Sequence, residues 1–104
     1  MKVSLYLRKH TGGYAHWCPG CEELHWIGVE APLSSGARWT FNGDLEHPTF
    51  SPSVRIRIPG ARPPLVECCH YFLTNGKISF CSDSTHGLSG KTVDLPVLPK
   101  GWDD

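Results

Sequence analysis

Two cysteines separated by a Pro-Gly dipeptide constrain this chain more than any other feature of its sequence. Cys18 and Cys21 flank Pro19 and Gly20. Proline favours a tight turn and glycine accepts backbone conformations that a side chain would strain, so both sulfurs can face one ion. Zinc binds such thiolate pairs and completes a tetrahedron with two further ligands. The motif therefore predicts a Zn2+ knuckle whose remaining ligands come from elsewhere in the chain.

The length and composition favour one small β domain. A chain of 104 residues has the size of a single domain. Its 11 glycines and 9 prolines, with 39% hydrophobic residues, suit short strands joined by many turns. We therefore expect a mainly β, single-domain fold over residues 1–104, stapled by a zinc-ribbon-like knuckle. Little helix is expected, and residues from about 91 to 104 form an extended tail.

The charge balance and the cysteine count argue against several classes of function. Ten basic residues balance ten acidic ones, which argues against nucleic acid or an anionic membrane as a partner. No apolar run is long enough to span a bilayer. Five cysteines, two of them adjacent at positions 68 and 69, do not make a regular disulfide framework. Thiols that serve a metal in a reducing compartment are expected instead, which predicts a cytoplasmic protein.

Two segments carry the two-residue period of half-buried β-strands. In residues 3–8 and residues 53–58, apolar side chains alternate with others. Each segment therefore predicts a strand with one face toward the core. In the second segment the face opposite the apolar side chains carries Ser53, Arg55 and Arg57.

The Asn75-Gly76 dipeptide is the strongest signal for a local structure. Both residues readily adopt the positive φ angles that a two-residue hairpin turn needs. The resulting register places His70 directly opposite Cys81 on one face of the hairpin. Cys69 then points to the other face, toward the core, because successive side chains of a strand alternate.

Several residues could complete the metal site with the knuckle. Cys69 lies on the core side of its strand, and the register brings His70 and Cys81 together. A histidine just beyond the hairpin, His86, could be oriented by Asp83. The spacing alone leaves the choice open among Cys69, His70, Cys81, His86 and His25.

Five ordered motifs give the chain a family resemblance. They are His16–Cys21, Trp39–Asp44, Pro48–Ser53, Cys69–His70 and Asp83–His86. Together they resemble the small, functionally uncharacterised proteins common in tailed phages and prophages, over roughly residues 14 to 96. Such proteins often carry the label ammonia monooxygenase. That label does not fit, because those enzymes are embedded in membranes and this chain has no spanning segment.

The resemblance narrows the predicted metal ligands. Such proteins keep the Cys-Pro-Gly-Cys knuckle, the histidine at position 25, the Cys-His pair and the Thr-His step. A cysteine at position 81 is not part of their pattern. Cys18 and Cys21 are therefore expected to bind Zn2+ with two ligands from Cys69, His70 and His86. Which two of them bind, and what roles His25 and Cys81 have, stays open.

The first expected function is that of a phage or prophage accessory protein with a structural zinc. It would act as a protein-interaction module without catalysis, binding a host or phage protein in the cytoplasm of the host cell. Aromatic side chains such as Trp26, Trp39 and Trp102 would serve this function if they are exposed, although packing in the core is the expected role of these tryptophans. The oligomeric state is not determined by the sequence.

The alternative function is a zinc- or serine-dependent hydrolase or peptidase. In the polar motif at residues 48–53, Ser51 could be a nucleophile with His70 or His86 as its base. Asp44 or Asp83 would then orient that base. A zinc with three protein ligands could instead activate water. Relatives in the resembled family occur beside genes for ubiquitin-like conjugation, which links a peptidase to such systems.

Overall fold

Eight β-strands form two antiparallel sheets in the computed structural model, which describes residues 1–30, 36–62 and 65–102. The smaller sheet has the order β1-β2-β3 and the larger one the order β4-β5-β6-β7-β8. The smaller sheet contains β1 (Arg8–His10), β2 (Gly13–Cys18) and β3 (Glu23–Gly28). The larger sheet contains β4 (Thr40–Phe41), β5 (Phe50–Arg57), β6 (Cys68–Thr74), β7 (Lys77–Phe80) and β8 (Thr92–Asp94).

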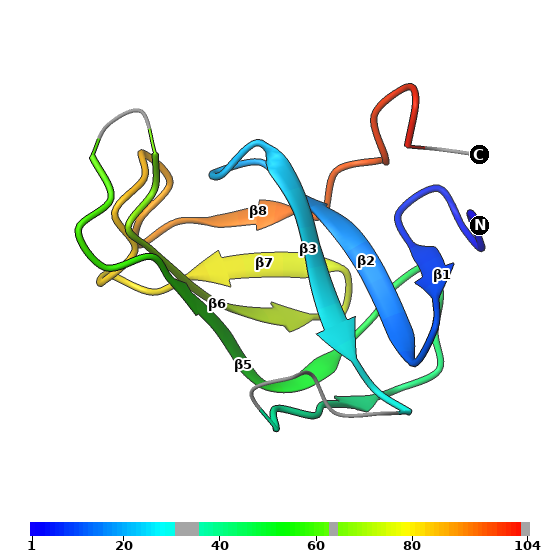
Figure 1. Cartoon of the computed structure of the whole chain (residues 1–104). Helices are drawn as coiled ribbons and strands as arrows, with labels where there is room; N and C mark the ends of the chain where they lie inside the picture. Colours follow the sequence, from blue (N-terminus) through cyan, green and yellow to red (C-terminus); the bar gives the residue numbers. More distant parts are fainter. Residues whose placement is uncertain (31–35, 63–64, 103–104) are drawn as a thin grey trace.

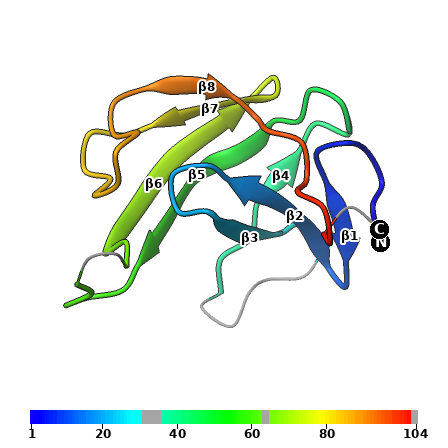
Figure 2. The same cartoon turned by 90° about the horizontal axis from the view of Figure 1, so that it is seen from above.

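The two sheets lie in separate layers, with β2 and β3 crossing in front of the larger sheet (Figures 1 and 2). Side chains from both layers fill the space between them. The buried core includes Leu7, Ile27, Trp39, Phe50, Val54, Tyr71, Leu73, Ile78, Phe80 and Leu95. The prediction of a mainly β fold is confirmed. Because the described residues contain no helix, none of them forms a helix that could cross a membrane.

The hairpin of β6 and β7 has the predicted turn and register. Asn75 and Gly76 have φ angles of 49° and 74°, as a two-residue turn of this kind requires. The backbone N–H of Cys81 donates to the carbonyl of His70 at 2.8 Å just beyond the paired strands. His70 and Cys81 therefore lie opposite one another, and Cys69 is buried on the core side.

The alternation predicted for residues 53–58 is confirmed as far as Arg57, whereas Ile58 lies beyond β5 and is 49% exposed. Val54 is buried in the core, whereas Arg55 and Arg57 are exposed on the other face. The register between β5 and β6 shifts between Phe50 and Val54. This irregularity interrupts the pairing just where Ser53 lies.

The strand predicted for residues 3–8 is wrong for most of its length. The hydroxyl of Ser4 accepts hydrogen bonds from the backbone N–H groups of Tyr6 and Leu7, both at 3.1 Å. The N–H of Val3 donates to the carbonyl of Leu7 at 3.0 Å, which closes the segment into a turn. A serine side chain thus competes with the strand ladder, and regular pairing begins only at Arg8.

The predicted tail and the three tryptophans, for which core packing is the expected role, have mixed outcomes. Thr92–Asp94 is β8 and pairs with β7, so part of the tail belongs to the sheet. Residues 103–104 of that tail lie outside the described residues. Trp39 is buried, whereas Trp26 and Trp102 are 41% and 47% exposed.

Candidate active site and metal centre

A cluster of three cysteines and one histidine joins the two sheets. Cys18 ends β2, Cys21 follows in the turn, His25 lies on β3, and Cys69 lies on β6. Their ligand atoms all lie within 4.8 Å of one another, and the sulfurs of Cys18 and Cys69 are 3.9 Å apart. The group could hold one metal ion with three sulfur ligands and one nitrogen ligand.

The Pro-Gly turn positions the first two sulfurs. The backbone N–H of Cys21 donates to the sulfur of Cys18 at 3.4 Å, and the N–H of Glu22 donates to the Cys18 carbonyl at 2.8 Å. Gly20 lies directly against the ring of His86, so a Cβ at this position would clash with that ring. A residue with a Cβ at position 20 would therefore force the ring of His86 to move.

A chain of three hydrogen bonds fixes the tautomer of His25. Nδ1 of His16 contacts the carbonyl of Trp17 at 3.1 Å, so this nitrogen must carry the proton. Nε2 of His16 must then accept from the Tyr71 hydroxyl at 2.6 Å. The Tyr71 oxygen in turn accepts from Nδ1 of His25 at 3.1 Å. This leaves Nε2 of His25 with a free lone pair.

The free lone pair on Nε2 of His25 makes the site suitable for a metal ion. Nε2 of His25 is buried and has no hydrogen-bond partner among the described residues. A buried polar atom without a partner carries a free-energy penalty, which a bound metal would remove. Burial also lowers the pKa of His25, so the ring is held in the neutral form that a metal needs.

The pKa values of His16 and Tyr71 keep the protons of this hydrogen-bond chain in place. Burial lowers the pKa of His16 to about 4, with the neighbouring His25 as a second cause. Burial raises the pKa of Tyr71 well above its usual value. At neutral pH, His16 is therefore uncharged and Tyr71 keeps the proton that it donates.

The three thiols share protons unequally. Contacts with the Cys21 and Cys69 thiols lower the pKa of Cys18 to about 2. The same sharing raises the pKa of Cys21 to about 12, and it raises the pKa of Cys69 as well. Cys18 is thus the thiol that loses its proton most readily, and a bound cation would displace the remaining protons.

His86 contacts this cluster through a different tautomer. Its Nδ1 accepts a hydrogen bond from the backbone N–H of Leu88 at 3.2 Å. In the neutral ring the proton is then on Nε2, which lies 3.5 Å from the sulfur of Cys69. His86 therefore donates a hydrogen bond to the sulfur of Cys69, which would orient this sulfur and stabilise it as a thiolate when a metal is bound.

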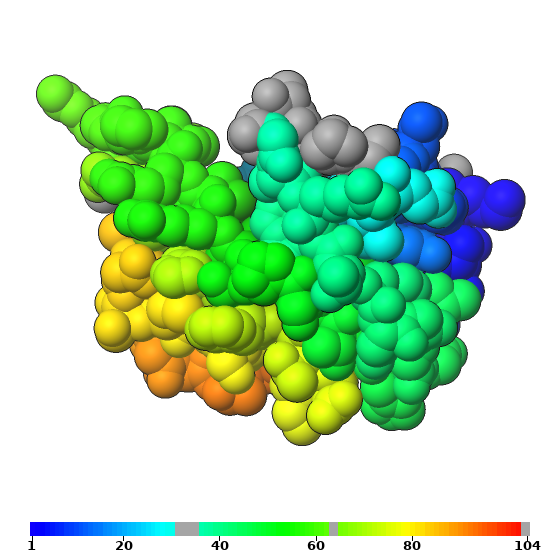
Figure 3. Space-filling view, turned by 90° about the horizontal axis from the view of Figure 1, so that it is seen from below, coloured from blue at the N-terminus to red at the C-terminus, as the bar shows by residue number. Residues whose placement is uncertain are grey.

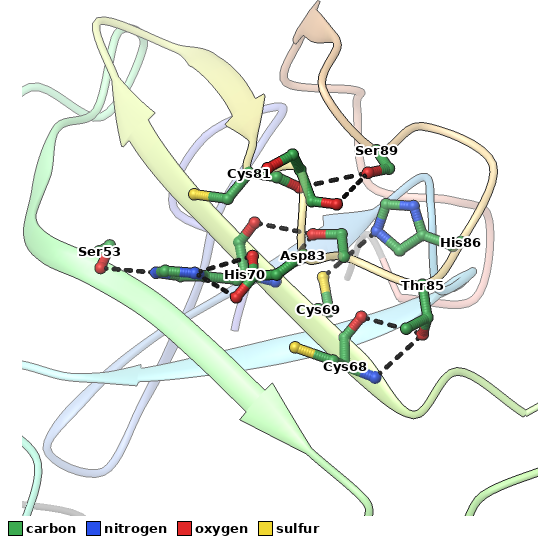
Figure 4. A network of polar contacts seen from close by, with 11 residues as sticks. Ser53, Cys68, Cys69, His70, Cys81, Asp83, Thr85, His86 and Ser89 are labelled. Carbon is green, nitrogen blue, oxygen red and sulfur yellow. Dashed lines mark hydrogen bonds and ion pairs between the residues drawn. The ribbon is translucent and has the colours of Figure 1, made fainter.

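A second group of polar side chains lies on the outward face of the larger sheet. Nε2 of His70 is 3.1 Å from the hydroxyl of Ser53, and Nδ1 of His70 is 3.1 Å from a carboxylate oxygen of Asp83 (Figure 4). His70 thus connects a hydroxyl on β5 to a carboxylate in the loop after β7. The side chain of His70 is 24% exposed and that of Asp83 is 49% exposed.

The loop that carries Asp83 is held against β6 by neighbouring hydroxyls. Ser84 accepts from the N–H of His70 at 3.0 Å and donates to the carbonyl of His70 at 2.9 Å. Thr85 makes the same pair of contacts with Cys68, at 3.0 and 3.2 Å. Since β7 ends at Phe80, these side chains satisfy β6 backbone groups beyond the paired strand.

A hydrogen bond to its carbonyl fixes the backbone of Ser53, the candidate nucleophile. The indole N–H of Trp39 donates to the carbonyl of Ser53 at 3.2 Å. Ser53 lies within the irregularity of β5, and its side chain points to the same face as His70. A hydroxyl, an imidazole and a carboxylate linked in this order are the groups of a serine-hydrolase triad.

This geometry agrees with a family comparison. A model of the family described as bacterial ubiquitination-like system serine protease (BubE) matches residues 2–81. The chain belongs to the BubE family. The span matched by the BubE model includes Ser53 and His70 and ends two residues before Asp83. Searches of curated proteins and of solved structures found no match.

In this BubE-family chain, the predicted metal ligands separate into two places. Cys18, Cys21 and Cys69 come together, and His86 contacts them through the sulfur of Cys69. His70 lies apart, on the outward face, with Cys81 and Asp83 as neighbours. That second group could also hold a metal, but both ring nitrogens of His70 already contact Ser53 and Asp83.

The predicted catalytic residues are likewise divided. Asp83 contacts His70 as one of the two proposed orienting carboxylates. Asp44 instead closes its own loop, accepting from the N–H groups of Glu46 and His47 at 3.0 Å, which lowers its pKa. The backbone of Ser51 pairs with Thr40 on β4, whereas the hydroxyl that contacts Nε2 of His70 belongs to Ser53, which is therefore the candidate nucleophile considered below.

Ser53 and His25 were not selected as site residues from the sequence, although the sequence carried a signal for each of them. The alternation of residues 53–58 placed Ser53 on the outward face, and the hairpin register placed His70 on the outward face too. Their meeting depended on the register between β5 and β6, which no local motif predicts. His25 was among the open candidates, and its distance to the three sulfurs together with its Tyr71 contact distinguishes it in the structure.

The cluster predicts which substitutions release the metal. His25→Ala and Cys69→Ala each remove a ligand, so metal content should fall well below one ion per chain. His70→Ala and Cys81→Ala should keep it, and His86→Ala should weaken binding by about 10- to 100-fold. Elemental analysis and competition with a chromophoric chelator measure both effects. Loss of metal in Cys81→Ala with retention in His25→Ala would contradict this ligand set.

Proposed function

We propose that the chain is a serine peptidase acting in a bacterial ubiquitin-like conjugation system. The observation that carries the proposal is the hydrogen-bond chain from Ser53 through His70 to Asp83. Membership of the BubE family supports both the reaction class and the biological system. The triad uses three residues from three segments, which is the usual way in which such sites are assembled.

Each triad residue has a distinct role in the proposed reaction. The hydroxyl oxygen of Ser53 attacks the scissile carbonyl while Nε2 of His70 accepts its proton. His70 then gives that proton to the departing amine, so the peptide bond breaks and an acyl ester remains on Ser53. Water hydrolyses this ester with His70 again as the base. Asp83 keeps the proton of His70 on Nδ1 and stabilises the charged ring.

The substrate that we propose is an extended segment of a ubiquitin-like protein or of its conjugates. The family description supports this class of substrate. The position of the triad supports it as well, because Ser53 and His70 lie on the outward face of a sheet. An extended chain can lie along such a face without entering a closed cavity.

We further propose that the metal is Zn2+ and that its role is structural. Three thiolates and one imidazole are a common structural zinc set, with no position left for water. Burial of Cys18, His25 and Cys69 supports a closed site. When bound, the ion would join β2, β3 and β6 and so hold the two sheets together.

The other expectations from the sequence stay predictions. They comprise a phage or prophage origin, a cytoplasmic location and a protein-interaction role without catalysis. The half-exposed Trp26 and Trp102 are available for such contacts, but no partner follows from them. The triad therefore favours the peptidase over the interaction module.

Substitution of the two candidate serines tests the proposed reaction. Ser53→Ala should lower kcat/KM by about 10⁴-fold or more, because it removes the nucleophile. Ser51→Ala makes the same chemical change two residues away and should keep most of the activity. Cleavage of a ubiquitin-like protein carrying a C-terminal extension, followed by mass spectrometry, measures both. Equal activity of the two variants would reject the Ser53 triad.

Removal of the metal tests the structural role of zinc. Purified protein should contain about one zinc per chain, and a strong chelator should unfold most of it, since structural zinc contributes roughly 10 to 16 kcal/mol in small domains. Acid should act similarly, because protons compete for the thiolates. Circular dichroism with and without chelator follows the change. A metal-free protein with an unchanged cooperative melt would contradict the structural role.

A further inference from the structure

One edge of β5 has backbone groups that no described strand pairs with. The N–H of Ile58 donates to the carbonyl of Glu67 at 2.7 Å. Hydrogen-bonded and non-hydrogen-bonded pairs alternate along an antiparallel ladder. Arg57 with Cys68, and Arg55 with His70, are therefore non-hydrogen-bonded pairs. The N–H and C=O groups of both arginines point away from β6.

Contacts on the far side of β6 confirm this alternation. The N–H of His70 donates to Ser84, and its carbonyl accepts from Cys81, so both groups point away from β5. Beyond β5, β4 pairs only with Phe50 and Ser51. Among the described residues, the edge of β5 at positions 55 and 57 is left without a neighbouring strand, and this green segment lies at the surface (Figure 3).

The side chains on this edge are cationic, and no described acidic residue forms an ion pair with them. Arg55 and Arg57 are exposed on the same face as Ser53. Neither takes part in an ion pair among the described residues, whereas Lys9 and Lys77 have acidic partners. Two exposed guanidinium groups next to a nucleophile are suited to bind carboxylates of a substrate.

The position of His70 limits the side from which a substrate can approach. Its ring lies on β6 and contacts the Ser53 hydroxyl from that side. A scissile carbonyl must therefore approach Ser53 from elsewhere. The free edge of β5 at Arg55 and Arg57 is on the side opposite β6 and leads along the same strand to Ser53, whose carbonyl is already bound by the Trp39 indole.

We infer that the substrate binds as an added antiparallel strand on the β5 edge, with acidic side chains facing Arg55 and Arg57. This inference rests on the proposed peptidase function. Strand addition to an open edge is a common mode of peptide recognition, in which backbone hydrogen bonds give affinity and side chains give specificity.

The antiparallel direction determines which part of the substrate meets the arginines. β5 runs from Ser53 toward Arg57, so the substrate runs from Arg57 toward Ser53. The residues beside Arg55 and Arg57 are therefore N-terminal to the bond that is cut. Paired residues share a face, so the two acidic residues are separated by one other residue.

Charge reversal in a peptide library tests the side-chain part of the inference. The wild-type protein should cut peptides with Asp or Glu at two alternate positions N-terminal to the cut. Arg55→Glu and Arg57→Glu should each lower kcat/KM for the best peptide by about tenfold or more and favour Lys or Arg at one position. Lys91→Glu makes the same charge change away from this edge and should keep the wild-type preference.

N-methylated peptides test the backbone part. Methylation of the amide that pairs with Arg55 should lower kcat/KM by about tenfold or more, because one inter-strand hydrogen bond is lost. Methylation of the adjacent amide, which points away from β5, should have little effect. The same alternation should recur at the residue that pairs with Arg57.

The outcomes separate this inference from the function on which it rests. If the wild-type protein cuts no peptide, or if Ser53→Ala cuts equally well, the proposed peptidase function fails and the inference fails with it. If cleavage depends on Ser53 but acidic residues are not preferred, or are preferred C-terminal to the cut, only the strand-addition inference is overturned. Uniform sensitivity to N-methylation at successive residues would also overturn it.

Discussion

The alternation of side chains along β6 is the constraint on which both sites depend. Cys69 and His70 are adjacent, so a strand must direct them to opposite faces. Cys69 points inward, where it meets the knuckle cysteines between the two sheets. His70 points outward, where it meets Ser53 and Asp83. One peptide unit therefore links a candidate metal centre to a candidate active site.

The loop after β7 strengthens this connection, because its residues reach both sites. Asp83 contacts the outward His70, whereas His86 contacts the inward Cys69. Between them, Ser84 and Thr85 replace the missing strand partner of β6 with hydroxyl contacts. Loss of the metal would free His86 and Cys69, and the same loop would then hold Asp83 less firmly. A metal in the candidate centre would thus help to position the candidate active site.

Local sequence signals predicted much of the fold. The Asn-Gly turn determined the β6–β7 register, and alternation determined the faces of β5. The strand prediction for residues 3–8 failed because the alternation of side chains does not show that a serine hydroxyl closes a turn there. The site depended on longer-range pairing. Ser53 meets His70 through the irregular β5–β6 ladder. His25 differs from His86 in lying within reach of all three sulfurs and in the tautomers that Tyr71 and Leu88 set.

Covalent labelling by an organophosphate most directly tests the claim that a metal-stapled sheet presents a serine triad. Such reagents modify a serine that an adjacent histidine activates. We expect a single label on Ser53 in the metal-loaded protein, detected by peptide mass spectrometry. His70→Ala, or prior removal of the metal by a chelator, should abolish it. A label on another serine, or labelling of Ser53 that persists at the same rate without His70 and without metal, would contradict this account.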